Sequence, residues 1–246
     1  MRALIVTAVA AEADSVATGL TAGLPPDPDP ADTGARALPG GYPLTRRHIP
    51  GLALDVLVGG VGPAAAAAAT ATALTLAHPA PYRLVVSAGI GGGFQPAAPV
   101  GSLVVGDALV AADLGAGTPD GFVPVDELGF GRTVHLPPAD LAARAAEATG
   151  ALLAPVLTVS TVTGTAARAA ELAARHPLAG AEAMEGFGVA EAAAAHGVPV
   201  LEVRAVSNAV GPRDRAAWRI GDALAALADG FRALGPVLAN WGEHDR

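Results

Sequence analysis

The chain has no cysteine among its 246 residues. Disulfide bonds, thiolate catalysis and zinc sites with cysteine ligands are therefore excluded. The six histidines are scattered over the chain, and no two of them have metal-ligand spacing. We therefore expect no metal site, and the histidines are interpreted as surface or helix-end residues.

Charged residues are scarce, at 15% of the chain, and all 15 basic residues are arginines. The formal net charge of −8 and the lack of a basic cluster argue against nucleic acid as a partner. Few charges also leave little polar surface, which favours a homo-oligomer. Because alanine, glycine and proline are abundant, the arginines fit a GC-rich coding bias, and one of them indicates function only where its position is special.

No stretch reaches the roughly 18 strongly apolar residues that a membrane helix needs. The alanine run 64–69 favours a helix instead. The first residues, MRALIVTAVAAEAD, contain an apolar run too short for a signal peptide, and Glu12 and Asp14 follow at once. We therefore expect a first β-strand there, and a cytoplasmic protein with no membrane partner.

The chain does have enough apolar sequence for a sizeable core, because 52% of its residues are hydrophobic. Short β-branched runs alternate with helical segments, without a composition shift or a repeat. We predict a single domain over residues 1–246 with an α/β fold, a three-layer sandwich around a central mixed twisted sheet. The predicted strands are 3–9, 44–49, 52–58, 83–89, 101–113, 156–161 and 199–207. The predicted helices start near 11 and 216 or cover 63–78, 138–149, 166–175 and 186–196.

The connections between these elements carry further expectations. Runs 44–49 and 52–58 flank a Pro-Gly turn and are predicted as a β-hairpin, which makes the sheet mixed. Residues 23–43 are rich in proline, glycine and aspartate and are predicted as an exposed loop. Residues 114–137 show no period that assigns an element.

A Gly-rich segment, GGVGPAA (59–65), matches the G-x-G-x-x-A sequence of dinucleotide-binding folds. Those folds also need an acidic residue at the end of the next strand, where this chain has Ser87, Ala88 and Gly89. Nucleotide-cofactor binding is therefore disfavoured, and we expect no cofactor. The chain also lacks G-K-[ST] and G-x-S-x-G, so neither a P-loop nor an α/β-hydrolase serine is expected.

Three polar residues stand where predicted strands end or helices start: Glu12, Glu185 and Asn208. Open α/β sheets bind ligands at the carboxyl ends of their strands, so the three together predict one site. Each has a structural alternative. Glu12 and Glu185 suit helix starts as acids, and Asn208 suits an Asx-turn.

Five segments that span almost the whole chain resemble the nucleoside phosphorylase/nucleosidase superfamily, in particular the methylthioadenosine/S-adenosylhomocysteine nucleosidases. In chain order they are TAVAAEADSV, GGVGPAAAAAAT, SAGIGGGFQPAAPVGSLVVGDAL, AMEGFGVAEA and VRAVSNAV. They resemble the family's first strand with its catalytic glutamate, its G-x-G-x-x-A-A helix start, its Gly-rich loop, its M-E-x-x-x-x-A ribose motif and its R-A-I-S-D. Each segment is weak alone, and their order is specific.

Two departures refine the resemblance. Where adenine-specific nucleosidases have the aspartate of R-A-I-S-D, this chain has Asn208. Together with MEGFGVA and EVRAVSNAVGPRDRAAWRIGDAL, this resembles the branch that hydrolyses futalosine and releases hypoxanthine in menaquinone biosynthesis. The family's E-M-E is Ala183-Met184-Glu185 here, so one acid is missing, and the family's aromatic residue near the base has no clear counterpart in VTGTAAR (162–168).

The resemblance implies a role for each site residue. Glu12 activates a water, and Arg204 orients that water and the carboxylates. Glu185 binds the ribose hydroxyls, Met184 packs against the sugar, and Asn208 faces the purine. The other expected substrate contacts are Ile90, Gly91, Thr163, Gly164 and Arg213.

Water is favoured over phosphate as the nucleophile, because a phosphate site needs arginines or an amide nest. No Arg or Lys lies between Arg83 and Arg132, which includes the Gly-rich loop where phosphorylases of the superfamily hold phosphate. Arg46 or Arg47 of a neighbouring subunit could still supply a cation. The alternatives are therefore a purine nucleoside phosphorylase, a nucleosidase for methylthioadenosine, S-adenosylhomocysteine or aminodeoxyfutalosine, and a nucleoside-binding module without turnover.

Overall fold

The computed structural model describes residues 1–24 and 34–244, and most of its strands join one mixed sheet. The strands are β1 (Arg2–Thr7), β2 (Ala35–Leu38), β3 (Tyr42–Ile49), β4 (Leu52–Val58), β5 (Leu84–Gly93), β6 (Leu103–Ala111), β7 (Gly115–Thr118), β8 (Gly121–Pro124), β9 (Val134–His135), β10 (Leu152–Thr158), β11 (Ala181–Ala183) and β12 (Val200–Ala209). The helices are α1 (Ala10–Thr21), α2 (Pro63–Thr75), α3 (Ala139–Thr149), α4 (Ala166–Arg175), α5 (Gly186–Ala195), the 3₁₀ turn η1 (Arg215–Ala217) and α6 (Ile220–His244).

The main sheet has the strand order β11-β10-β6-β12-β5-β1-β4-β3-β2, and β9 pairs with β6. β12, β5, β1 and β4 run parallel to one another. β11 also pairs with β5, antiparallel, so that this end of the sheet curls back on itself. The carboxyl end of β5 therefore lies between β12 on one side and β11 on the other.

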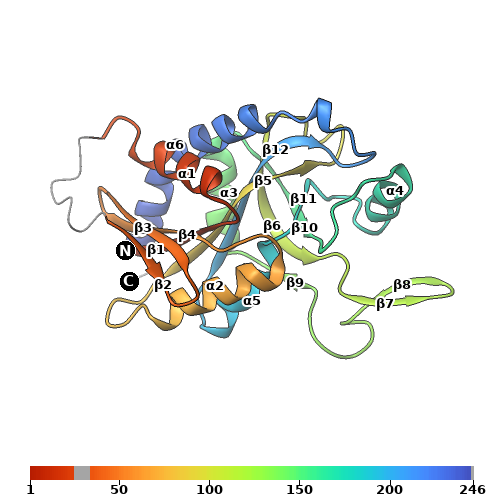
Figure 1. Ribbon diagram of the computed structural model, residues 1–246, viewed down its shortest axis with the longest axis horizontal. Helices are drawn as coiled ribbons and strands as arrows, with labels where there is room; N and C mark the ends of the chain where they lie inside the picture. The colour runs from red at the N-terminus through yellow and green to blue at the C-terminus, as the bar shows by residue number, and fades with distance from the viewer. Residues whose placement is uncertain (25–33, 245–246) are drawn as a thin grey trace.

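Helices cover both faces of the sheet (Figure 1). On one face α1, α3 and α6 enclose a core in which Phe231 of α6 packs among sheet residues such as Val86 and Val203. On the other face α2 and α5 pack together over β1 and β5, with Ala69 and Val189 among the buried residues. The predicted three-layer α/β sandwich with a mixed central sheet is confirmed.

Two predicted strand boundaries differ from those in the structure, and each difference has a physical reason. The strand predicted to end at Gly89 continues through the glycines to Gly93, because β12 and β11 pair along both edges and glycine allows that close approach. The strand predicted over 156–161 is β10, which starts at Leu152. Pro155 lies at a register irregularity there, and it interrupts the sequence pattern without ending the strand.

Five short strands, β2, β7, β8, β9 and β11, were not predicted from the sequence. In the predicted loop 23–43, residues 35–38 form β2 at the edge of the sheet, whereas residues 25–33 lie outside the described residues. The unassigned segment 114–137 contains the β7–β8 hairpin and β9. β11 has only three residues, too few for a sequence period. None of the helices over the described ranges has the length and apolarity needed to cross a membrane.

A buried aspartate ties the edge of the sheet to β1. Asp55 of β4 is fully buried and forms ion pairs with Arg2 Nη2 at 2.5 Å and with Arg46 Nε at 2.8 Å. The Tyr82 hydroxyl donates a further bond to Asp55. Burial by itself would raise the pKa of Asp55, but the bonds from Arg46, Tyr82 and Arg2 outweigh it and hold that pKa below its usual range.

We predict that Asp55→Asn lowers the free energy of unfolding at neutral pH by about 2–3 kcal/mol, less than for a fully buried pair because both arginines are partly exposed. Urea unfolding measures the loss, and Asp229→Asn, which breaks an exposed pair with Arg232, should change stability by less than about 1 kcal/mol. Because the pKa of Asp55 is lowered by folding, its contribution exists above the unfolded value of about 3.9 and disappears as the pH falls through the folded value. A difference between wild type and Asp55→Asn that stayed constant down to about pH 2 would contradict this role.

Candidate active site

A cavity of about 370 Å³ opens where β1, β5 and β12 end and β11 passes into α5. It brings together residues that are far apart in the sequence. Its described wall consists of Ala8, Val9, Glu12, Val61, Ile90, Gly91, Gly92, Val162, Thr163, Glu182, Ala183, Met184, Glu185, Ser207, Asn208, Ala209, Gly211, Pro212, Arg213 and Trp218.

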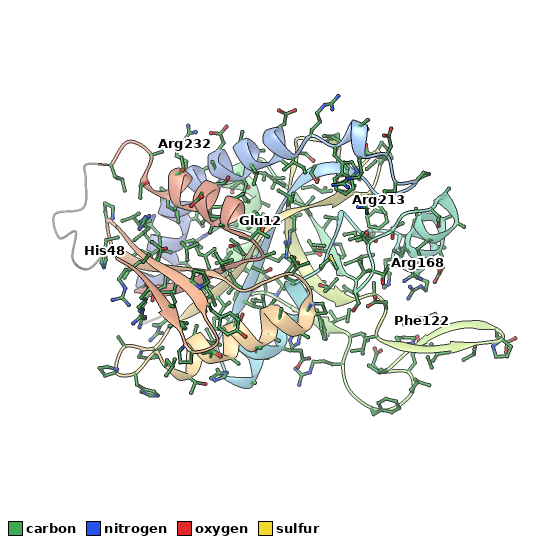
Figure 2. All side chains as sticks on the ribbon, in the orientation of Figure 1. Glu12, His48, Phe122, Arg168, Arg213 and Arg232 are labelled. Atoms are coloured by element: carbon green, nitrogen blue, oxygen red, sulfur yellow. The ribbon has the colours of Figure 1, made fainter. Side chains whose placement is uncertain are left out.

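Glu12 serves the helix start and the cavity at once. Its Oε2 accepts the N–H groups of Ala8 at 2.9 Å and Val9 at 3.3 Å, the contact by which an acid in the first turn caps a helix. Its Oε1 accepts the N–H of Ile90 at 2.9 Å, and the side chain is only 4% exposed. Glu12 therefore does cap the start of α1, as the structural alternative predicted. The same bonds hold its carboxylate in the cavity wall, near the middle of the molecule (Figure 2).

Glu185 is held from two sides at the start of α5. Its Oε1 accepts the N–H of Gly62 at 3.2 Å, and its Oε2 accepts a bond from Arg204 Nη1 at 3.1 Å. Gly62 has a φ of +94°, a conformation that favours glycine, and it turns its N–H toward the carboxylate. The Gly-rich segment before α2 thus positions an acid of the site instead of a dinucleotide phosphate.

Arg204 lies behind Glu185 and does not line the cavity. It is 1% exposed, and its remaining bonds go to Glu202 Oε1 at 2.9 Å and Ser87 Oγ at 3.0 Å. Burial alone would lower the pKa of Arg204, but the carboxylates of Glu202, Glu185 and Glu12 outweigh it and raise that pKa. Arg204 was predicted as a catalytic residue that orients the water and the carboxylates; the structure places it against the Glu185 carboxylate and outside the cavity wall, and its role stays a prediction.

Glu202 is the second carboxylate that forms an ion pair with Arg204, and it is fully buried. Burial raises its pKa, against the attraction of Arg204. Its Oε2 has no hydrogen-bond partner among the described residues. A side chain on Gly186 would come within 2.2 Å of this carboxylate, so the glycine that opens α5 provides the space for Glu202.

Asn208 presents its amide to the cavity with a defined orientation. Its Oδ1 accepts the Ser207 hydroxyl at 2.9 Å, and its Nδ2 donates to the carbonyl of Ala209 at 2.9 Å. One N–H and one oxygen lone pair remain free for a ligand. Neither bond is that of an Asx-turn, in which the side-chain oxygen accepts a backbone N–H two residues on.

Thr163 and Glu182 form the opposite wall. The carboxylate of Glu182 accepts the Thr163 N–H at 2.8 Å and the Thr163 hydroxyl at 2.5 Å. Burial raises the pKa of Glu182, against these two bonds. Gly164, also predicted to contact substrate, is not part of the cavity wall, and its carbonyl accepts the Arg213 N–H at 3.1 Å.

Arg213 lines the cavity on the side toward α4 (Figure 2). Its guanidinium lies 5.0 Å from the centre of the Trp218 ring, which lines the cavity as well. Over the described part of the chain, no group of three or more His, Asp or Glu side chains has the arrangement of a metal site.

A family model described as the phosphorylase superfamily matches residues 3–234. The chain belongs to this superfamily. It is 63% identical to a protein named futalosine hydrolase from Streptomyces coelicolor, over 255 aligned residues that cover all of both chains. The predicted resemblance is confirmed by both comparisons.

Solved structures of the superfamily share the fold. The methylthioadenosine/S-adenosylhomocysteine nucleosidase from Colwellia psychrerythraea, in complex with adenine, aligns with a TM-score of 0.78 at 23% identity and covers 97% of this chain and 95% of its own. The futalosine hydrolase of Helicobacter pylori gives a TM-score of 0.78 at 18% identity, over 95% and 97% of the two chains. At these identities the likeness establishes the architecture alone.

Two residues of the cavity wall, Glu182 and Trp218, were not predicted from the sequence. Glu182 lies in the three-residue β11, which gave no strand pattern to mark its ends. Trp218 follows the irregular segment after β12, and its one sequence signal is rarity, since the chain has only 2 tryptophans.

Proposed function

We propose that this protein hydrolyses the N-glycosidic bond of futalosine and releases hypoxanthine and dehypoxanthine futalosine, a step of menaquinone biosynthesis. The full-length relative at 63% identity bears the name of this activity. The observation that carries the proposal is that one cavity brings together the carboxylates of Glu12 and Glu185 and the amide of Asn208. No metal or organic cofactor is needed for this chemistry.

Cleavage of the bond leaves positive charge on the ribose and negative charge on the departing purine, so carboxylates belong near the sugar. Glu185 accepts bonds from the ribose hydroxyls, and Met184 packs against the sugar ring. Glu12 takes a proton from the water whose oxygen attacks the anomeric carbon, while the bond from that carbon to the purine nitrogen breaks and the purine N7 takes up a proton from solvent. Arg204 and the Gly62 N–H hold Glu185 in place for this contact.

Asn208 selects the base. Hypoxanthine that leaves with hydrogen on N7 presents a donor at N7 and an acceptor at O6. The free lone pair and free N–H of the Asn208 amide complement this pair of groups. A 6-amino base with hydrogen on N7 presents two donors, which suits the two acceptor oxygens of an aspartate. At position 208 an aspartate would place one of these oxygens next to the Ala209 carbonyl oxygen, which now accepts a bond from Asn208 Nδ2, and the two acceptors would repel each other.

Water is the proposed nucleophile because cations are few. Among the described residues of the cavity wall, Arg213 is the one cation. Arg46, considered for a phosphate site across a subunit interface, is engaged by Asp55. The assay described below separates this hydrolase from three alternatives: a nucleoside phosphorylase, a nucleosidase for 6-amino substrates and a binding module without turnover.

Arg213 suits the 5′ arm of the substrate. Futalosine carries a benzoate there, and a carboxylate near an apolar wall requires a cation. Arg213 and Trp218 offer both a cation and an apolar face at one end of the cavity. The cytoplasmic location and the homo-oligomeric state stay predictions.

We predict that the purified protein releases hypoxanthine from futalosine in phosphate-free buffer and produces a reducing sugar. Chromatography of the products with futalosine, its 6-amino analogue, methylthioadenosine and inosine, each with and without phosphate, measures this. A need for phosphate with formation of a sugar 1-phosphate would identify a phosphorylase. Preference for a 6-amino substrate would assign the alternative nucleosidase, and no release of any base would leave only a binding module.

We predict that Glu12→Gln lowers turnover of futalosine by roughly 100- to 10,000-fold, because an amide cannot take a proton from water. The substituted side chain would also place an NH₂ group against backbone donors, so we expect a stability loss of about 1–3 kcal/mol without unfolding. Steady-state kinetics and thermal unfolding separate the two effects. The control is Glu147→Gln, an exposed acid of α3, with unchanged kinetics. Retention of more than about a tenth of the activity would leave Glu12 with the capping role alone.

We predict that Asn208→Asp lowers kcat/KM for futalosine by roughly 10- to 100-fold and shifts the preference toward the 6-amino analogue, because each mispaired buried group costs about 1–3 kcal/mol. Competition between the two substrates measures the preference directly. Equal losses on both substrates would indicate a disturbed site, and the selector role would then be wrong.

A further inference from the structure

Glu182 is a buried acid of the cavity wall that the proposed mechanism does not use. It is 5% exposed, and both of its hydrogen bonds come from Thr163, a neutral residue. A buried carboxylate that receives only these bonds is expensive to maintain, so its position in the wall of a ligand cavity calls for a functional reason.

The sheet register places Glu182 and Asn208 on opposite sides of one glycine. Asn208 of β12 is the partner of Gly92 on one edge of β5, and Glu182 of β11 is its partner on the other edge. Residues directly opposite each other in neighbouring strands point to the same face of a sheet. All three residues line the cavity, and a side chain on Gly92 would lie 3.3 Å from Asn208 Nδ2.

Gly92 has no side chain, so it leaves space between Asn208 and Glu182, whose strands flank the carboxyl end of β5. Neighbouring strands lie about 4.8 Å apart, so the two backbones are separated by roughly twice that distance. A planar base fits between them with one edge toward Asn208 and the other toward Glu182. Val61 and Val162 add apolar surface to the same cavity.

The two walls differ in the hydrogen bonds that they offer. The N–H and hydroxyl donors of Thr163 are both consumed by Glu182. An ionised carboxylate has about four lone-pair positions and no donor, so what remains on this wall is acceptor capacity alone. A 6-oxopurine carries hydrogen on N1 and can donate to such a wall, whereas the N1 of a 6-aminopurine is an acceptor and cannot.

We propose that Glu182 is a second specificity-determining residue, which accepts the N1–H of the 6-oxopurine while Asn208 binds its N7 and O6 edge. This inference rests on the proposed release of hypoxanthine. In this proposal both edges of the base distinguish a 6-oxopurine from a 6-aminopurine. Replacement of Asn208 alone therefore changes the recognition of only one edge. Because the base leaves as a neutral molecule with hydrogen on N7, the carboxylate does not oppose its departure.

The test compares Glu182→Gln with wild type on futalosine and its 6-amino analogue. Glutamine has nearly the same shape and adds an N–H donor that the N1 of a 6-aminopurine can accept. We expect the ratio of kcat/KM values, futalosine over the 6-amino analogue, to fall at least about tenfold. Glu147→Gln should leave the ratio unchanged. An unchanged ratio in Glu182→Gln, or equal losses on both substrates, would overturn the proposal.

A measurement with free bases keeps the test independent of turnover and of the folding of a variant. Calorimetry on the wild-type protein should give binding of 1-methylhypoxanthine, which has no N1–H, at least about tenfold weaker than that of hypoxanthine. Equal binding of the two bases would overturn the role of Glu182, even if the protein hydrolyses futalosine. Conversely, if futalosine is not cleaved but hypoxanthine binds and its methylated form does not, the proposed function fails and the base site stands.

Discussion

One buried cation organises the site. Arg204 is enclosed by protein and reaches Glu185, Glu202 and Ser87 at once. A cation in such a place is stable only while its carboxylate partners are present, and the carboxylates are stable only while the cation is present. The glycines around it follow from this constraint, since a side chain on Gly89 would come within 2.8 Å of Arg204 Nη1 and 2.5 Å of Glu12 Oε1.

The acids of the cavity gain their positions from backbone groups as well as from Arg204. Glu12 receives three backbone N–H groups, from the segment before α1 and from β5. Glu185 receives the N–H of Gly62 in addition to the arginine. Fixed donors of this kind orient a carboxylate before substrate arrives, so little ordering remains to be done during the reaction. Structural capping and chemistry are therefore properties of the same bonds here.

The proposed base-binding end of the cavity has Asn208, which offers a donor and an acceptor, on one side and Glu182, which offers acceptors, on the other. Ser207 and Ala209 fix the amide of Asn208, and Thr163 uses its donors on Glu182. The solved structures with different names share this scaffold. On the proposed function, selection of the base would depend on a few side chains at strand ends and on the neighbours that leave some of their polar atoms free.

The layered α/β fold could be predicted from the sequence, because short β-branched runs that alternate with helical segments permit few other arrangements. The sequence also marked Glu12, Glu185 and Asn208, since polar residues at the ends of apolar strands are conspicuous. The tertiary structure was needed to show which further residues line the cavity. Glu182 and Trp218 do, whereas Arg204 and Gly164 do not. Whether an arginine faces a ligand or stands behind a glutamate depends on side-chain direction, and the three-residue β11 exists only because β5 and β10 offer it open edges. Both are properties of contacts between distant segments, which no local pattern encodes.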